Sequence, residues 1–276
     1  ILSNNTTVIE DIKTNENKVG YSFAARYLIT PKLFVKSSFE KGYRLPEPME
    51  IFGDGISVDA NSELKPEESE NLNISVHNTL NFNNNKLSTS VNFFRRDVLN
   101  FTQRISFGRR SKYVNIRDVL IYGFELDFNY SYKKRLFVDA NFTRQYSLNN
   151  VKLNDRGDLN RAYKEQLPNT PFLFSNLMVS YDLIKDPKKY KVTGNYSLNY
   201  VKEFYLGYAF IATAFDKNTI PEQLTNDLGL TISSINERYS LSIQATNIFN
   251  QRVFDNFNIQ KPGRAIFAKI RYNFNK

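Results

Sequence analysis

The sequence predicts an all-β fold, and within this class an antiparallel transmembrane β-barrel. Three observations lead to this prediction. Apolar and polar residues alternate with a period of two wherever a period is visible. Many of the alternating stretches reach the roughly 9–11 residues that a tilted strand needs to cross a bilayer. Short and long connections alternate along the chain, which places turns at one rim of a barrel and loops at the other.

Eleven strands are expected, and many exceed the roughly 5–6 residues that are usual in soluble proteins. They are residues 19–29, 33–44, 69–82, 87–104, 113–132, 136–147, 171–184, 190–206, 223–233, 239–249 and 263–274. In six of them one face is mostly apolar: Leu72, Ile74, Val76, Asn78, Leu80 and Phe82; Phe124, Leu126, Phe128, Tyr130 and Tyr132; Tyr190, Val192, Gly194, Tyr196, Leu198 and Tyr200; Leu224, Asn226, Leu228, Leu230 and Ile232; Tyr239, Leu241, Ile243 and Ala245; Ile266, Ala268, Ile270, Tyr272 and Phe274. The other five strands are bounded by the connections around them.

Short and long connections follow one another without exception. The short ones are 30–32, 83–86, 133–135, 185–189 and 234–238, and the long ones are 45–68, 105–112, 148–170, 207–222 and 250–262. A soluble β-sandwich has shorter strands and no such alternation. A soluble barrel with its polar face outward stays open on this pattern. Tyr and Phe near the strand ends favour the membrane barrel, because its two interfaces carry aromatic girdles.

The composition argues against several functional classes. The chain of 276 residues has 37 Lys+Arg, 28 Asp+Glu, one His and no Cys. The lack of cysteine excludes disulfides and thiolate metal sites, and the single His77 excludes a multi-histidine metal site and argues against a His-based triad. The net charge of +9 lies mostly in turns and loops rather than on one stripe, which argues against nucleic acid as a partner. We therefore expect no enzyme, no cofactor and no metal site.

Several short segments carry Gly, Pro, Arg or Asn in distinctive patterns. They are Gly42-Tyr43-Arg44-Leu45-Pro46; Asn61-Ser62-Glu63-Leu64-Lys65-Pro66-Glu67; Tyr113-Val114-Asn115 with Tyr122-Gly123-Phe124-Glu125; Leu167-Pro168-Asn169-Thr170-Pro171; Asn247-Ile248-Phe249-Asn250; and Pro262-Gly263-Arg264, ahead of Phe274. Their order and spacing resemble those in the C-terminal half of the β-barrel of TonB-dependent outer-membrane receptors, and the composition is similar to that of Bacteroidetes. Ser62 stands where the family box has proline, and two residues follow the Phe274 on which the family usually ends.

The resemblance implies a barrel of about 22 strands around an N-terminal plug. Eleven strands are an odd number and leave two open edges, whose unpaired backbone groups are costly in lipid. We therefore expect residues 1–276 to be the C-terminal portion of such a barrel, with the plug and the first half of the barrel absent from this chain. Strands 19–29 and 263–274 are then the edges that pair with the absent half.

The resemblance also implies a function. A receptor of this kind sits in the outer membrane of a Gram-negative bacterium and imports a scarce nutrient, such as a siderophore, oligosaccharide, peptide or cofactor. The TonB-ExbB-ExbD complex drives import by pulling on the plug. Further implied partners are outer-membrane lipid and lipopolysaccharide, a surface lipoprotein, and the small-molecule or oligomeric nutrient itself. A passive porin or structural barrel is the alternative, and a soluble all-β binding protein is a second one.

Two groups of residues are candidates for ligand binding. Arg104, Arg109 and Arg110 belong to a basic loop that is suited to an anionic ligand or to lipopolysaccharide phosphates. Tyr163, Tyr205 and Tyr208, with Phe210 nearby, are suited to stacking on a sugar or a catecholate. The competing interpretations are a solvated loop for the first group and an interface girdle for the second.

The remaining motif residues are expected to have structural roles. Arg44 is expected to order the adjoining loop through Glu47, Glu50 or Asp54. The others are Pro46, Asn61, Pro66, Glu67, Asn115, Gly123, Glu125, Asn247, Phe249, Asn250, Gly263, Arg264 and Phe274. Prolines end strands because they withhold a ladder donor, and Pro262-Gly263 forms a turn before the last strand. A terminal Phe274 at a membrane rim is an interface anchor.

Overall fold

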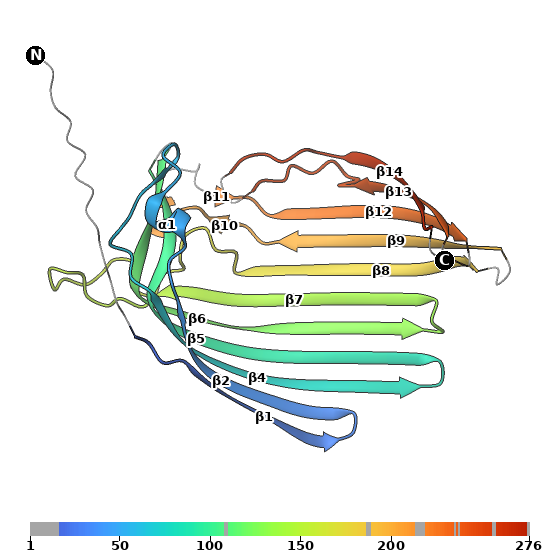
Figure 1. The fold of residues 1–276 in the computed structure, drawn as a ribbon, viewed down its shortest axis with the longest axis horizontal. Coiled ribbons are helices and arrows are strands. Elements are labelled where there is room, and N and C mark those ends of the chain that lie inside the picture. The colour runs from blue at the N-terminus through green and yellow to red at the C-terminus, as the bar shows by residue number, and fades with distance from the viewer. Residues whose placement is uncertain are drawn as a thin grey trace, which may run out of the picture.

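The computed structural model describes residues 17–107, 110–185, 189–212, 219–234, 236, 238–255 and 258–274. These residues form one large antiparallel sheet with the strand order β1-β2-β4-β5-β6-β7-β8-β9-β12-β13-β14 (Figure 1). The bounds are β1 Tyr21–Thr30, β2 Leu33–Arg44, β4 Glu67–Phe82, β5 Asn85–Phe107, β6 Arg110–Tyr132, β7 Leu136–Asn149, β8 Leu173–Lys185, β9 Tyr190–Val201, β12 Gln223–Ser234, β13 Tyr239–Thr246 and β14 Ala265–Tyr272. Neighbours in sequence are neighbours in space, so the sheet is a simple meander.

The loops contain short helices and strands. Helix α1 (Pro48–Phe52) and β3 (Val58–Asp59) lie between β2 and β4, and β3 pairs in parallel with β6. Between β9 and β12 are β10 (Phe204–Tyr205), α2 (Ala209–Ala212) and β11 (Thr219–Ile220), where β10 and β11 form a separate two-stranded sheet. Helices as short as these carry no helical period that a sequence pattern can show.

The eleven expected strands are confirmed, and several of their boundaries differ by a few residues. The expected strand 239–249 ends at Thr246. The expected long loop 105–112 is wrong, because β5 and β6 pair as far as Phe107 and Arg110 and form one tall hairpin. The expected strand 190–206 ends at Val201, and the chain then forms the short β10. The last strand is shorter than expected and covers Ala265–Tyr272. Polar side chains at the hairpin tip hide this extension from a search for apolar alternation.

Turns and loops lie at opposite ends of the sheet. In Figure 1 the short turns between β1 and β2, β4 and β5, and β6 and β7 lie on the right, and the long loops lie on the left. Lys133 and Lys134 both have positive φ angles, 50° and 53°, which closes the turn between β6 and β7 in the tight form that hairpins favour. The expected alternation of connection lengths is thus present as a spatial separation of the two rims.

The two faces of the sheet differ in polarity. Cross-strand register aligns Val35, Val76, Val91, Leu126 and Phe142 in one row, which defines the apolar face. At its turn end this face carries a row of partly exposed tyrosines, namely Tyr132, Tyr181, Tyr190 and Tyr239. The opposite, polar face carries Asn, Ser, Asp and Glu. An apolar face bounded by aromatic side chains is the pattern of a wall that meets lipid.

The buried core is small and lies near the loop end of the polar face. Val98, Val119 and Leu167 are at most 2 % exposed and pack with Phe101 and Ile116. Leu167 belongs to the loop between β7 and β8, so this loop folds back over the polar face of the β5–β6 hairpin. The apolar face, in contrast, stays accessible across most of the sheet, as large side chains such as Ile74 (44 % exposed) show.

The sheet is open at both edges. Among the described residues β1 pairs only with β2, and β14 pairs only with β13. The chain therefore forms part of a barrel wall rather than a closed barrel, which is the partial barrel that the odd strand number predicts.

No helix within the described ranges is long and apolar enough to cross a membrane.

Candidate ligand-binding site

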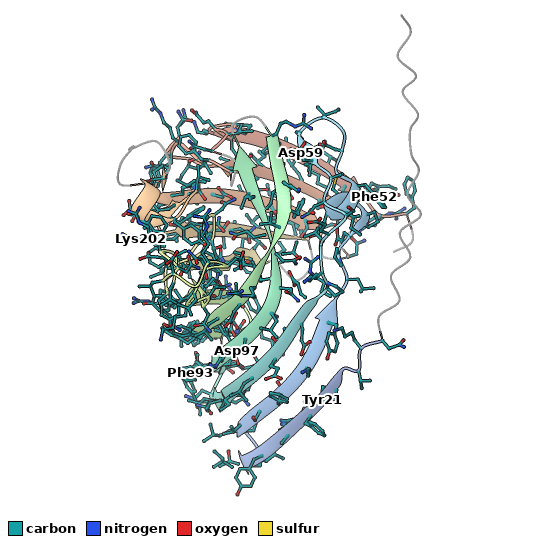
Figure 2. The ribbon with its side chains drawn as sticks, turned by 90° about the vertical axis from the view of Figure 1, so that its left-hand side faces the viewer. Tyr21, Phe52, Asp59, Phe93, Asp97 and Lys202 are labelled. Carbon is teal, nitrogen blue, oxygen red and sulfur yellow. The ribbon has the colours of Figure 1, made fainter. Side chains whose placement is uncertain are left out.

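The β5–β6 hairpin rises above its neighbours at the loop end of the sheet. β7 pairs with β6 only as far as Val119, so the upper part of β6 has a free edge. β3 fills this edge, where Val58 lies beside Ser111 and Asp59 beside Lys112. Figure 2, which views the molecule from the loop end, shows Asp59 near the top of the hairpin. The loop 45–66 is thus tied to a strand that lies three strands away from where the loop begins.

Arg44 orders the base of this loop. Its guanidinium binds Glu50 of α1 and Glu67 of β4, each at 3.0 Å. Glu67 also accepts a hydrogen bond from the Thr102 backbone N–H at 2.6 Å. The expected contact of Arg44 with Glu50 is present, and Glu67 is a second partner. The two carboxylates raise the pKa of Arg44 above its ordinary value, with the hydrogen bond to Glu67 as the largest cause.

The loop that follows α1 is shaped by its own backbone. Asp54 Oδ1 accepts hydrogen bonds from the N–H groups of Ile56, Ser57 and Val58 at 2.7–2.9 Å, and the Ser57 hydroxyl donates to Oδ2. These donors hold the pKa of Asp54 well below its ordinary value. Gly53 has a φ of 67°, and a Cβ there would lie 2.1 Å from the Val58 carbonyl oxygen. A glycine is therefore required at this turn.

Two asparagines fasten the end of the loop to the hairpin. Asn61 Nδ2 donates to the Tyr113 carbonyl at 2.7 Å. The side chain of Asn115 accepts from the Lys65 N–H at 2.8 Å and donates to the Asn100 carbonyl at 2.7 Å. Pro46 lies two residues after the end of β2, and Pro66 directly precedes β4, so both bound the strands from outside. The segment 61–67 is thus bound both to Arg44 of the segment 42–46 and to the β5–β6 hairpin.

The basic group is partly engaged by the protein itself. Arg104 Nε donates to Ser111 Oγ at 2.8 Å, and Arg110 forms an ion pair with Asp59 of β3. Both Arg110 and Asp59 remain partly exposed, with 58 % and 37 % of their side chains accessible. Arg109 lies outside the described residues. The hairpin therefore presents cationic side chains near its tip, and the neighbouring loop offsets the charge of Arg110 through Asp59.

The aromatic group lies where two other loops meet. Tyr208 accepts a hydrogen bond from Asn149 Nδ2 at 2.8 Å, and its ring stacks on Phe210 with centroids 5.5 Å apart. The Arg161 guanidinium lies 4.7 Å from the Phe210 ring centroid. Burial raises the pKa of the Tyr208 phenol. Sequence reasoning missed Asn149 and Arg161, because only the fold brings them to this stack.

The other two tyrosines of this group are placed differently. Tyr205 lies in β10, and its carbonyl accepts the Asn169 N–H at 2.7 Å, which ties the segment 202–212 to the loop between β7 and β8. Tyr163 carries the Lys164 ammonium 5.3 Å from its ring centroid. Tyr205 is 41 % exposed, and its ring is accessible. Within the described residues, no ring contact joins Tyr163 or Tyr205 to the Tyr208–Phe210 stack.

Hydrogen bonds link the two halves of the loop end. Gln103 of β5 donates to the Pro168 carbonyl at 2.9 Å, and Gln145 of β7 donates to the Pro171 carbonyl at the same distance. The hairpin with its basic tip and the loops with the aromatic stack are therefore parts of one supported assembly. The Leu-Pro-x-x-Pro segment supplies the carbonyls, which accounts for its place in the sequence.

A polar hollow lies beneath this assembly on the polar face. Its volume is about 430 Å³, and its lining includes Asn71, Asn92, Arg96, Glu125 and Leu167. Arg96 Nε donates to Asn71 Oδ1 at 2.7 Å, and Asn92 Nδ2 donates to Glu125 Oε2 at 3.1 Å. Sequence reasoning named Glu125 as a motif residue but missed Arg96, whose only signal is its position on the polar face of β5. The hollow therefore presents a positive side chain, Arg96, and a negative one, Glu125, toward the inside of the barrel wall.

The remaining motif residues hold turns and close contacts. Asn250 Oδ1 accepts the Arg264 N–H at 2.9 Å, and a Cβ on Gly263 would lie 2.3 Å from that oxygen. Asn247 bonds to Gln251 through both ends of its amide and accepts no substitute without losing one bond. Phe249 and Phe274 are 66 % and 83 % exposed. Gly123 leaves room for β7, because a Cβ there would lie 2.2 Å from the Arg144 carbonyl oxygen.

Comparison with known proteins identifies the family. Residues 2–248 match the family model described as TonB dependent receptor-like, beta-barrel. The chain belongs to this family. Curated protein sequences give no match to this receptor chain.

Solved receptor structures share the fold. The copper transporter OprC aligns with a TM-score of 0.67 and 15 % identity, covering 92 % of this chain and 38 % of OprC. The siderophore receptor PiuA from Acinetobacter baumannii gives 0.66 and 17 %, covering 92 % and 35 %. The FrpB iron transporter from Neisseria meningitidis, F3-3 variant, gives 0.65 and 13 %, covering 92 % and 39 %. At these identities the likeness shows the fold alone, and the chain spans little more than a third of each of these proteins.

Proposed function

We propose that residues 1–276 form the C-terminal part of the barrel of an outer-membrane receptor that imports a scarce nutrient. The match of residues 2–248 to the receptor barrel family carries this proposal. The absent strands complete the barrel along the open edges of β1 and β14, and an N-terminal plug lies inside it. The family's barrels are of the Gram-negative outer membrane, and the apolar face with its tyrosine row suits that location.

The ligand binds at the loop end, above the polar hollow. The basic hairpin tip with Arg104 and Arg110 favours an anionic ligand, since oriented cations raise the local concentration of anions. The Tyr208–Phe210 stack with Arg161 offers a ring surface on which a sugar or catecholate packs. The two surfaces are joined through the Gln103–Pro168 hydrogen bond, so one ligand can bind both or pass from one to the other.

Import is driven by TonB. The TonB-ExbB-ExbD complex pulls on the plug, which then releases the ligand inward past the polar hollow. Lipopolysaccharide surrounds the barrel, and a surface lipoprotein covers the loop end where the nutrient is an oligomer. A passive porin is the alternative outcome of the experiment that follows.

Uptake by cells that carry the complete receptor tests this proposal. Ferric siderophores, oligosaccharides, peptides and cobalamin are supplied in turn as the limiting nutrient to receptor-positive and receptor-null cells. Growth that needs the receptor and is lost when TonB is deleted supports the proposal. Receptor-dependent growth that survives the loss of TonB shows a passive pore instead.

A further inference from the structure

A small charged cluster stands on the apolar face, where lipid is the expected neighbour. It consists of Arg95 and Asp97 on β5, Tyr122 on β6, and Arg144 and Tyr146 on β7, and it is called the arginine–tyrosine cluster below. Register places Arg95 beside Tyr122 and Tyr122 beside Tyr146, in the same set of alternate positions as Phe93, Phe124 and Phe142. Phe93 and Asp97 lie on the left in Figure 2, away from Phe52 of α1 on the right. The cluster therefore points outward from the wall.

The contacts within the cluster leave cationic donors unused. Arg95 binds Asp97 through Nε at 2.8 Å and through a terminal nitrogen at 3.0 Å. Tyr122 and Tyr146 stack with centroids 5.3 Å apart, and the Arg144 guanidinium lies 5.4 Å from the Tyr146 ring centroid and donates to its hydroxyl. A guanidinium has five N–H donors. Among the described residues no carboxylate pairs with Arg144, so no described acidic group offsets its charge.

The height of the cluster explains why charges are tolerated there. Tyr122 is ten residues from Tyr132, the girdle tyrosine at the turn end of the same strand. At about 3.4 Å per residue and a tilt of about 40°, this separation spans about 26 Å along the membrane normal. The apolar band of such barrels is about 25 Å tall. Tyr122 and its register partners Arg95 and Tyr146 thus lie at the outer interface, level with lipid headgroups, where a lipid-facing charge costs little. Arg144 pairs with Phe124, two residues nearer the turn end, and its guanidinium extends to this level, where it donates to the Tyr146 hydroxyl.

We propose that the arginine–tyrosine cluster binds a phosphate group of lipopolysaccharide in the outer leaflet. Arg144 supplies the uncompensated charge, and the free donors of Arg95 contact the same headgroup from the other side of the stacked tyrosines. Arginine is suited to this role because its planar donors match phosphate oxygens. The tyrosine rings pack on the sugar to which the phosphate is attached. This inference rests on the proposed placement in the outer membrane, because only there does this face meet lipopolysaccharide.

The test is native mass spectrometry of the complete receptor, recovered from the outer-membrane fraction and released from detergent. The probes are bis-phosphorylated lipid A, phosphate-free lipid A and phosphatidylglycerol. The variants are Arg144→Leu and the double variant Arg95→Gln/Arg144→Leu. Leucine suits a lipid-facing position, so these variants are expected to insert normally. Arg96→Gln is the matched control, because Arg96 is the next residue of the same strand and faces the polar side, where it binds Asn71.

Wild-type receptor and Arg96→Gln are expected to retain bis-phosphorylated lipid A. Arg144→Leu is expected to bind it about tenfold more weakly, and the double variant more weakly still, since a hydrogen bond to a charged group is lost in each step. Equal retention by Arg144→Leu, or equal binding of phosphate-free lipid A or phosphatidylglycerol by the wild type, overturns the inference. Receptor that is found in the outer membrane without arginine-dependent lipid A refutes this site alone. Receptor that is absent from the outer membrane refutes the proposed placement as well.

Discussion

The Arg44–Glu50–Glu67 network predicts how firmly the loop 45–66 is held. Replacing Arg44 with methionine keeps the aliphatic stem but removes the charge from between two carboxylates that are only 11 % and 15 % exposed. Removing one partner of a fully buried ion pair costs about 3–5 kcal/mol. The Arg44 side chain is itself 40 % exposed, so solvent screening lowers this to about 2 kcal/mol.

The cost falls on local opening of the loop rather than on the sheet. Hydrogen exchange reads such opening directly, because an amide exchanges when its segment opens. A loss of about 2 kcal/mol is expected to speed exchange about thirtyfold at the amides of α1 and β3 and at Thr102, whose N–H binds Glu67. Exchange in the centre of β6 should not change.

Arg117→Met is the matched control for this experiment. Arg117 of β6, like Arg44, lies toward the loop end of the sheet, but its ion pair is with Asp155, whose side chain is 99 % exposed. This variant is expected to leave exchange in the loop 45–66 unchanged. Unaltered exchange of α1 in Arg44→Met, or equal acceleration by both variants, would refute the reasoning that the network holds the loop.

Three further predictions follow from single contacts. Gly123→Ala should prevent assembly or lower the free energy of unfolding by about 3 kcal/mol or more, because the new Cβ would lie 2.2 Å from the Arg144 carbonyl oxygen. Gly207→Ala should be neutral, because a Cβ there would have nothing within 4 Å. Urea unfolding in detergent compares the two variants. The turn at Asp54 should stay protected at pH 4 and open only as the pH falls through the depressed pKa of Asp54 in the folded protein. The reason is that a lowered carboxyl pKa stabilises the fold above the unfolded value of about 3.9 and ceases to do so on protonation. Exchange at the Val58 amide measured against pH checks this, and opening that begins above pH 5 would contradict it. Arg110→Glu should repel Asp59, which loosens β3, and should weaken uptake of an anionic nutrient. The charge swap Asp59→Arg/Arg110→Glu should restore the pairing of β3, and uptake should stay reduced in it only if Arg110 itself contacts the ligand. Uptake equal to wild type in Arg110→Glu would remove this residue from the site.

The strands could be predicted from the sequence because each half-buried strand carries its own period of two. Residues 69–82 show this directly, since Leu72, Ile74 and Val76 share one face, and Ile74 and Val76 lie beside the apolar Phe93 and Val91 of β5. The tip of the β5–β6 hairpin could not be predicted in this way. It pairs with the short β3 rather than with a long strand, and its polar side chains leave no alternation to detect.

The candidate site was harder to predict because it depends on contacts between distant segments. Arg110 is conspicuous in the sequence, but its ion pair with Asp59 of β3 follows from the path of a loop. The same holds for Asn149, which binds Tyr208 across two loops. Arg144 and Arg95 carry no motif, and their role depends on the register that brings both of them to the apolar face, within two residues of the same level of β6.

The open edges connect the fold to the family. An unpaired edge is costly in lipid, so β1 and β14 need partners that the described residues do not supply. The solved receptors that share the fold are between two and three times as long as the aligned part of this chain. The additional strands of such a protein are the natural partners of both edges, which is why the wall curves without closing.

The direction in which the apolar face points is the central claim of this account. Residues 1–276 contain no cysteine, so a single spin label can be introduced at Ile74→Cys or at the adjacent Asn73→Cys, in a complete receptor from which any cysteine outside these residues has been removed, in lipid bilayers. Collision rates with oxygen, which concentrates in lipid, and with a water-soluble nickel chelate then report the surroundings of each face. The account predicts a high oxygen and a low nickel collision rate at residue 74, and no such lipid signature at residue 73. A high nickel collision rate at residue 74 would show that the apolar face does not meet lipid, and the membrane-wall interpretation would be wrong.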